Sequence, residues 1–125
     1  MKDRQVDVSE TELAILDVLW ENGEATIRQI NDRLYEAPTT ATYATVQKLL
    51  ERLEAKSCVS RDRSAFAHVF RATVKRGTLI DVRLQEVADK LCGGSLTPLV
   101  THLVGTRKLS ARDRAALKKW IDEQR

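Results

Sequence analysis

Residues 39–57, TTATYATVQKLLERLEAKS, decide how this sequence is interpreted. On a helix with 3.6 residues per turn, four apolar residues fall at i, i+3, i+4 and i+7 and form one stripe that belongs in a core. These residues are Val46, Leu49, Leu50 and Leu53. A second stripe, on another side of the helix, consists of Thr45, Lys48 and Arg52. Its hydroxyl and cationic groups suit an anionic surface with hydrogen-bonding edges, and duplex DNA is such a surface.

The formal charge changes sign along the chain, although the total is only +3. Residues 1–38 hold four Lys or Arg against nine Asp or Glu, a net charge of −5. Residues 39–76 hold eight against three, a net charge of +5. The positive segment contains the amphipathic helix and the residues after it, and a DNA footprint would lie there. A solvated surface explains such a charge run equally well, so charge alone does not choose between the two.

Length and composition exclude several classes of protein. With 125 residues, the chain forms one domain or two small ones that support each other. No run approaches the ~18 consecutive apolar residues of a membrane-spanning helix, and the N-terminus lacks the apolar block of a signal peptide. We therefore expect a cytoplasmic protein with no membrane partner. Cys58 and Cys92 have no C-x-x-C spacing, so neither a disulfide framework nor a zinc site is predicted.

Two capping boxes predict where the first two helices begin. In each, a Ser or Thr hydroxyl accepts a hydrogen bond from the backbone three residues on, where a Glu or Gln reaches back. The pairs are Ser9 with Glu12 and Thr26 with Gln29. Gly23 supplies a left-handed stop for the first helix, and Pro38 requires the second to end before it. For the third helix, Thr42 is the N-cap that best fits the phase of the apolar stripe.

After residue 57 the apolar period changes from 3.6 to 2. Val59, Arg61 and Arg63 alternate with their neighbours, and so do Phe66, His68 and Phe70, which predicts two short strands joined near residues 63–65. Three helices followed by a basic hairpin are the parts of a winged helix-turn-helix module. In that arrangement the third helix enters the major groove and the hairpin lies along a phosphate backbone. Arg61 and Arg63 are then expected to contact phosphates.

The helical period returns from about residue 73, with caps at Ser95 and Ser110 and stops at residues 92–94 and Gly105. Three amphipathic helices in so short a segment cannot cover their own apolar faces, so we expect a second copy to cover them in a homodimer. The expected fold is mainly α with a small β-hairpin (α+β), with a winged-helix DNA-binding domain over residues 1–74 and a helical dimerisation domain over residues 75–125. The candidate dimerisation residues are Leu84, Val87, Leu91, Leu96, Leu99, Val100, Leu103, Leu117, Trp120 and Ile121.

Three patterns in order resemble the penicillinase repressor family over nearly the whole chain. They are E-x-x-I-L-x-x-L-W at residues 12–20, Y-x-T-V-x-x-L-L-x-R-L-x-x-K at 43–56 and G-G-S-L-x-x-L-V at 93–100, followed by L-S-x-x-D at 109–113. The resemblance implies a dimeric repressor, not an enzyme, that binds palindromic double-stranded DNA through its third helix and wing. The candidate DNA-binding residues are Thr42, Tyr43, Thr45, Lys48, Arg52, Arg61 and Arg63. For Tyr43, a phenol-to-phosphate contact and a ring packed beside the second helix both remain open.

The main departures from that family concern the signal that makes a repressor release its DNA. Copper-responsive members carry C-x-C motifs at the C-terminus, and no cysteine follows Cys92 here. Repressors of antibiotic-resistance genes are cleaved at an Asn-Phe bond in the first dimerisation helix, and residues 81–91 contain neither residue. The wing has Arg63-Ser64 where the family usually has Gly-Arg. No inducing protease, ligand, cofactor or metal is therefore predicted.

Three alternatives stay open on the sequence alone. An enzyme would have to use His68, His102 or the two cysteines, and no motif pairs any of them as nucleophile and base. A metal- or redox-responsive regulator would use Cys92 and His102, which lack ligand spacing. A winged helix can also bind protein rather than DNA. In that case we expect apolar residues where Thr45 and Lys48 stand.

Overall fold

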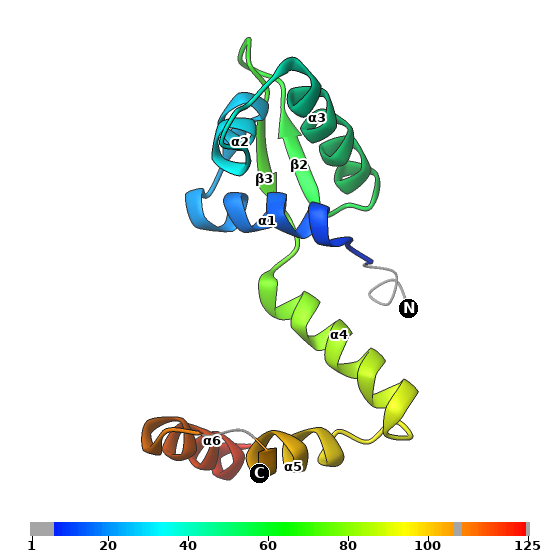
Figure 1. The fold of residues 1–125 in the computed structure, drawn as a ribbon, viewed down its shortest axis with the longest axis vertical. Coiled ribbons are helices and arrows are strands. Elements are labelled where there is room, and N and C mark those ends of the chain that lie inside the picture. Colours follow the sequence, from blue (N-terminus) through cyan, green and yellow to red (C-terminus); the bar gives the residue numbers. More distant parts are fainter. Residues whose placement is uncertain (1–6, 107–108, 125) are drawn as a thin grey trace. The chain divides into compact units, whose positions relative to one another are not determined.

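The computed structural model describes residues 7–106 and 109–124, and Figure 1 shows their helices and strands. The chain divides into two compact units, residues 1–82 and residues 83–125. The elements of the first unit are α1 (Glu10–Asn22), β1 (Ala25–Thr26), α2 (Ile27–Leu34), α3 (Thr40–Ala55), β2 (Val59–Asp62) and β3 (Val69–Ala72). Helix α4 (Arg76–Leu91) begins in the first unit and ends in the second, which continues with α5 (Thr97–Thr106) and α6 (Ala111–Glu123).

The apolar stripe of α3 lies in the core of the first unit, as predicted. Val46, Leu50 and Leu53 are wholly buried and Leu49 is nearly so. They share one cluster with residues of α1, α2 and the sheet, among them Ile15, Leu16, Leu19, Ile30, Val59 and Phe70. Burial of each large apolar side chain stabilises the fold by about 1.5–3 kcal/mol. This cluster therefore holds α3 in place and leaves its other face in solvent.

Both predicted capping boxes are present. At the start of α1, the Glu12 backbone N–H donates to the Ser9 hydroxyl (3.2 Å) and the Ser9 N–H donates to the Glu12 carboxylate (2.9 Å). At the start of α2, Thr26 and Gln29 form the same pair of bonds, at 3.2 and 2.9 Å. Gly23 ends α1 with φ of +86°, a left-handed conformation that glycine adopts readily. The sequence therefore predicted these boundaries correctly.

The prediction that Thr42 caps α3 is wrong, because the helix begins three residues earlier. Thr39 is the N-cap, with φ of −133° and ψ of 176°, and its hydroxyl accepts from the Thr42 N–H at 3.1 Å. The Thr42 hydroxyl accepts in return from the Thr39 N–H at 2.8 Å. Thr42 is thus the third helical residue and completes a capping box with a hydroxyl in place of the usual Glu or Gln.

The sheet differs from the predicted hairpin in two ways. Strand β3 begins at Val69 rather than at Phe66, because Asp62 opposite Val69 is the last pair between β2 and β3. Residues 63–68 therefore form a loop at the tip of the hairpin, which we call the wing tip. The two-residue strand β1 was not predicted, and it pairs antiparallel with Val69 and Phe70 to give the order β1-β3-β2. The fold class is otherwise as expected, mainly helical with a small antiparallel sheet in a winged-helix layout.

In the second unit, the Ser110 cap and the glycine stop after α4 are as predicted. Ser95 is not the N-cap of α5 as predicted, because the helix begins only at Thr97, whose N–H donates to the Ser95 hydroxyl at 3.2 Å. After α4, Gly93 and Gly94 have φ of +61° and +88°, and the Gly94 N–H donates to the Ala88 carbonyl at 2.9 Å. The Ser110 hydroxyl accepts from the Asp113 N–H at 3.0 Å and starts α6. Gly105 does not stop α5 as predicted, since the helix includes it and extends to Thr106. Within the described part of the chain, no helix has the length and hydrophobicity needed to cross a membrane.

Candidate nucleic-acid interface

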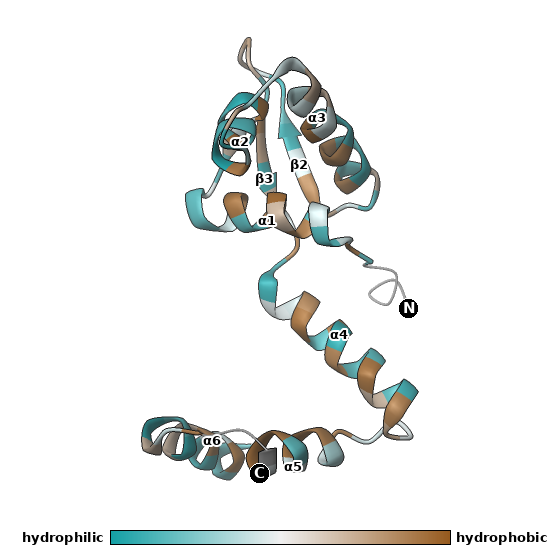
Figure 2. Cartoon of the chain, viewed as in Figure 1, coloured by the Kyte–Doolittle hydropathy of each residue, from teal (hydrophilic) through white to brown (hydrophobic). Residues whose placement is uncertain are grey.

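The polar stripe of α3 lies in solvent, about a third of a turn around the helix from the buried stripe. Thr45, Lys48 and Arg52 are all exposed, and Figure 2 shows hydrophilic and hydrophobic residues interleaved along this helix. The Thr45 hydroxyl donates to the Ala41 carbonyl at 3.1 Å, which leaves its oxygen lone pairs able to accept. One cationic, hydrogen-bonding helix face, held rigid by a buried face, is what direct readout in a major groove requires.

Thr42 and Tyr43 occupy different positions at the start of α3. The Thr42 hydroxyl both accepts from the Thr39 N–H and donates to the Thr39 carbonyl (3.0 Å), so it serves the helix cap. Tyr43 is exposed to 39% and lines two open hollows, together with Arg28 of α2 in both cases. Its ring is therefore at the surface beside α2, with the phenol accessible to a phosphate.

The two wing arginines differ in how far their side chains are exposed to solvent. The Arg61 side chain is only 15% exposed, lies 3.2 Å from the Glu54 carboxylate and stacks 4.8 Å from the centre of the Phe70 ring. The Arg63 side chain is 59% exposed and lies 3.6 Å from the other oxygen of Glu54. Glu54, in the last turn of α3, thus joins the helix to the hairpin. Of the two cations, Arg63 is the one presented to solvent.

The wing tip is held by a turn at its start. The Ser64 backbone N–H donates to the Asp62 carboxylate at 2.9 Å, and hydrogen bonds from the Ser64 hydroxyl and N–H lower the pKa of Asp62. Beyond this turn, Phe66 is fully exposed. It lines the same hollow as Tyr43 and Arg28, with Gln47 and His68. Sequence reasoning did not bring Arg28, Gln47, Phe66 and His68 to this hollow, because no periodicity relates α2, α3 and the wing tip.

An ion pair between the buried Glu12 and the partly exposed Lys56 supports the end of α3. The Lys56 ammonium, just after α3, donates to the Glu12 carboxylate at 2.7 Å and to the Asp7 carbonyl at 2.6 Å. Burial raises the pKa of Glu12, but the bonds from Lys56 and Ser9 and the Lys56 charge outweigh it, so the net pKa is lowered from 4.5. This pair joins the end of α3 to the start of α1, which fixes the helix that carries the polar stripe.

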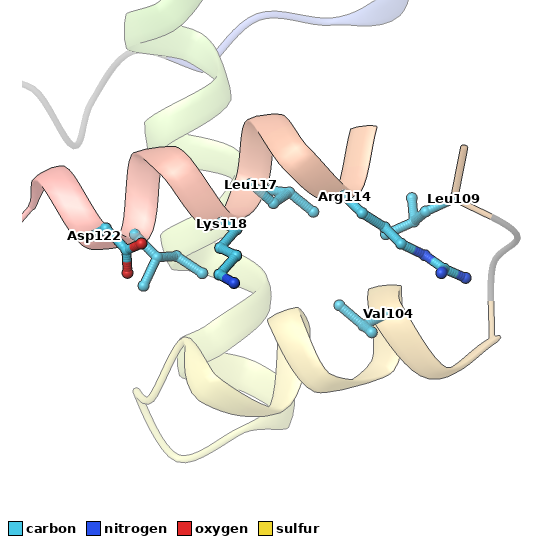
Figure 3. Close-up of a pocket in the computed structure, with 7 residues that line it drawn as sticks. Val104, Leu109, Arg114, Leu117, Lys118 and Asp122 are labelled. Atoms are coloured by element: carbon cyan, nitrogen blue, oxygen red, sulfur yellow. The ribbon is translucent and has the colours of Figure 1, made fainter. Parts of the chain in front are cut away.

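The second unit exposes most of its predicted dimerisation residues. Leu99 and Leu117 are half-buried, and the others range from 40% exposed at Val87 to 80% at Leu91. Hydrophobic residues recur along α4 and α5 in Figure 2. Between α5 and α6 an apolar trough of about 260 Å³ opens, in which Val104 and Leu117 face each other, with Arg114, Lys118 and Asp122 along it (Figure 3). These surfaces suit apolar side chains of another helix.

Neither cysteine forms a disulfide, and burial raises the pKa of the Cys58 thiol. Cys58 is buried, whereas Cys92 is only half-buried. In residues 7–106 and 109–124, no three side chains of His, Cys, Asp or Glu lie close enough together to hold a metal ion.

Comparison with known protein families decides what kind of protein carries this surface. A family model described as penicillinase repressor matches residues 8–123. The chain belongs to the penicillinase repressor family. A search of curated proteins found no match. The penicillinase repressor match spans both compact units and confirms the resemblance seen in the sequence. Members are non-enzymatic winged-helix transcription regulators, so this chain is a DNA-binding transcriptional repressor and not an enzyme.

Proposed function

We propose that this repressor acts as a homodimer and binds a palindromic operator by placing α3 of each copy in the major groove. The observation that carries the proposal is the exposed polar face of α3, with Thr45, Lys48 and Arg52 in solvent beside a buried stripe. A recognition helix needs that combination of rigid support and accessible donors. Repression then follows from occupancy of the promoter and requires no chemistry.

The contacts divide by type. Thr45 and Lys48 approach base edges, whereas Arg52, two turns beyond Thr45, contacts a phosphate or the groove edge. Tyr43 adds a phenol-to-phosphate contact beside α2. Arg63 contacts the backbone from the wing, and Arg61 and Thr42 support the interface through Glu54 and Thr39. In this proposal residues 1–74 bind DNA and residues 75–125 form the dimer.

Homodimerisation is supported by the apolar surface of the second unit. Eight of the ten candidate dimerisation residues are exposed, a larger apolar area than an isolated unit of this size is expected to leave in water. A two-fold dimer places two α3 helices about 34–36 Å apart, one turn of B-DNA, which requires half-sites with that spacing. Sedimentation at micromolar concentration tests this step, and a purely monomeric boundary would contradict it.

The DNA contacts are tested with a duplex that the full-length chain selects from a random-sequence pool. Replacement of Lys48 or Arg52 by Ala is expected to weaken binding by about 1–3 kcal/mol where a base or strong phosphate contact is lost. Lys119→Ala on α6 is the matched control, since it removes an exposed cation from the other unit. Unchanged affinity in both α3 variants, or an equal loss in the control, would contradict the proposed interface.

A further inference from the structure

The hollow between the start of α3 and the wing tip has the chemistry of a DNA strand site. Its α2 and α3 side is lined by Arg28, Tyr43 and Gln47, and its wing side by Arg61, Phe66 and His68. It encloses about 400 Å³. Guanidinium, phenol and amide groups donate to phosphate oxygens, and their clustering favours a polyanion over an apolar partner.

Phe66 has no role in the packing of its own unit. Its side chain is fully exposed, at 105% of the reference area. A single exposed apolar residue is ordinary by itself. Here it lines the same hollow as the phosphate donors, which is the second observation that points to a ligand. The hairpin tip and the start of α3 lie at the same end of the first unit (Figure 1).

The wing tip is also anchored where it leaves the sheet. The Asp62–Val69 pair closes it, and the Ser64 N–H bond to Asp62 turns the chain at its start. An apolar group on a short loop closed by strand pairing loses less conformational freedom on binding than one on a free chain. The fold therefore holds Phe66 ready for a contact outside the protein.

We propose that this hollow holds the sugar-phosphate strand that separates the two grooves, and that Phe66 packs against deoxyribose on the minor-groove side of that strand. This proposal rests on the proposed function, in which α3 occupies the major groove. The next surface across one strand from a major groove is the minor groove, where apolar side chains of other proteins pack or insert. Arg28 and Tyr43 then donate to the phosphates of the strand, and Phe66 supplies apolar contact beyond it.

The test compares Phe66→Ala, Phe66→Leu and Arg63→Ala in the full chain, on the labelled duplex selected by the unaltered chain. Phe66→Ala is expected to weaken binding about tenfold, which corresponds to about 1.4 kcal/mol. Phe66→Leu keeps apolar area and is the matched control, with a loss of no more than about threefold. The slope of log K against log salt stays unchanged in Phe66→Ala, because no charged contact is lost. It falls by about 1 in Arg63→Ala.

Each outcome bears on the proposal. Phe66 is fully exposed, so an unchanged thermal melting curve is expected and would exclude unfolding as the cause of a loss. Equal affinity of Phe66→Ala and the unaltered chain, while Lys48→Ala is weakened, would overturn the Phe66 contact and leave the proposed function intact. A changed salt slope in Phe66→Ala would also overturn it. Failure of the unaltered chain to enrich any duplex would overturn both proposals.

Discussion

At the scale of single residues, the buried Glu12 has two tasks. Its backbone and side chain complete the cap of α1, it is 1% exposed, and it pairs with Lys56 at the end of α3. The capping box was evident from the sequence because its two residues stand three apart. The pair with Lys56 was not, because it joins residues 44 positions apart. The local sequence pattern thus predicted the helix cap that Glu12 forms, but not its ion pair with Lys56.

The lowered pKa of Glu12 makes the stability of the first unit depend on pH. A carboxyl group whose pKa is depressed by folding contributes stability above its ordinary value of 4.5, and this is lost as the pH falls through the folded value. Glu12→Gln is therefore expected to lower the free energy of unfolding by about 1–3 kcal/mol near neutral pH, since Lys56 loses its buried partner. The difference from the unaltered chain should shrink on acidification.

Urea unfolding at several pH values measures this dependence. Glu10→Gln is the matched control, because Glu10 is an exposed acid in the same helical turn. A constant difference between Glu12→Gln and the unaltered chain across the acidic range would show that the charge of Glu12 does not stabilise the fold.

At the scale of elements, α3 was the most predictable part of the chain. Its buried and polar stripes follow from residue spacing alone, and both lie where the period places them. Its first residue was harder to predict, because Thr39, Thr40 and Thr42 are all acceptable caps and the phase of the apolar stripe pointed to the wrong one, Thr42. In the structure the N-cap is Thr39, and its capping box with Thr42 satisfies the backbone N–H groups of both residues.

The wing was less predictable, because pairing across strands is not a local property. Alternation of Phe66, His68 and Phe70 is the pattern of a strand, yet pairing with β2 extends only to Val69. Strand β1 has two residues, too few for any period to show. The cluster around Glu54 likewise depends on the fold, since Arg61 and Arg63 approach it from the neighbouring hairpin. The sequence therefore identified candidate DNA-binding residues by their side-chain chemistry. Only the structure shows which of those side chains are exposed and which are held by a partner.

Glu54 provides a prediction about the coupling of α3 to the wing. Glu54→Gln removes the charge that attracts Arg61 and Arg63, which frees Arg63 in particular to contact phosphates. DNA affinity at low salt is expected to rise, and the slope of log K against log salt to steepen by about 0.9 for each added phosphate contact. Loss of these partly exposed ion pairs should lower stability by no more than about 1 kcal/mol.

Binding measured over a series of salt concentrations tests this coupling. Glu51→Gln is the matched control, since it removes an exposed carboxylate from the same helix. If both variants show the same slope, the effect is one of net charge and the wing arginines are not restrained by Glu54.

At the scale of the whole molecule, the chain forms two compact units. The family match covers both. The sequence indicated two segments by their change of pattern, but it did not show that α4 begins inside the first unit. Leu79, in the second turn of α4, is 7% exposed and belongs to the core cluster of the first unit. Leu84 and Val87, further along the same helix, are exposed. One helix therefore contributes to the core of the first unit and to the apolar surface proposed for dimerisation.

The proposed dimer predicts a large loss of DNA binding when that apolar surface is broken. Leu84→Lys places a charge on an exposed apolar position of α4, so folding is expected to persist while association fails. Two linked half-site contacts gain about 10²–10⁴ in affinity over one, and a monomeric variant should lose that gain on a full palindrome. Its affinity for an isolated half-site should not change.

Sedimentation velocity and binding to full and half sites measure the two effects together. Gln85→Lys is the matched control, since it adds the same charge at the adjacent exposed polar position. If Leu84→Lys remains dimeric and binds the palindrome like the control, α4 is not part of the dimer surface. If it becomes monomeric yet keeps full affinity for the palindrome, the two α3 helices do not bind as a linked pair. In that case operator recognition resides in the single winged-helix unit.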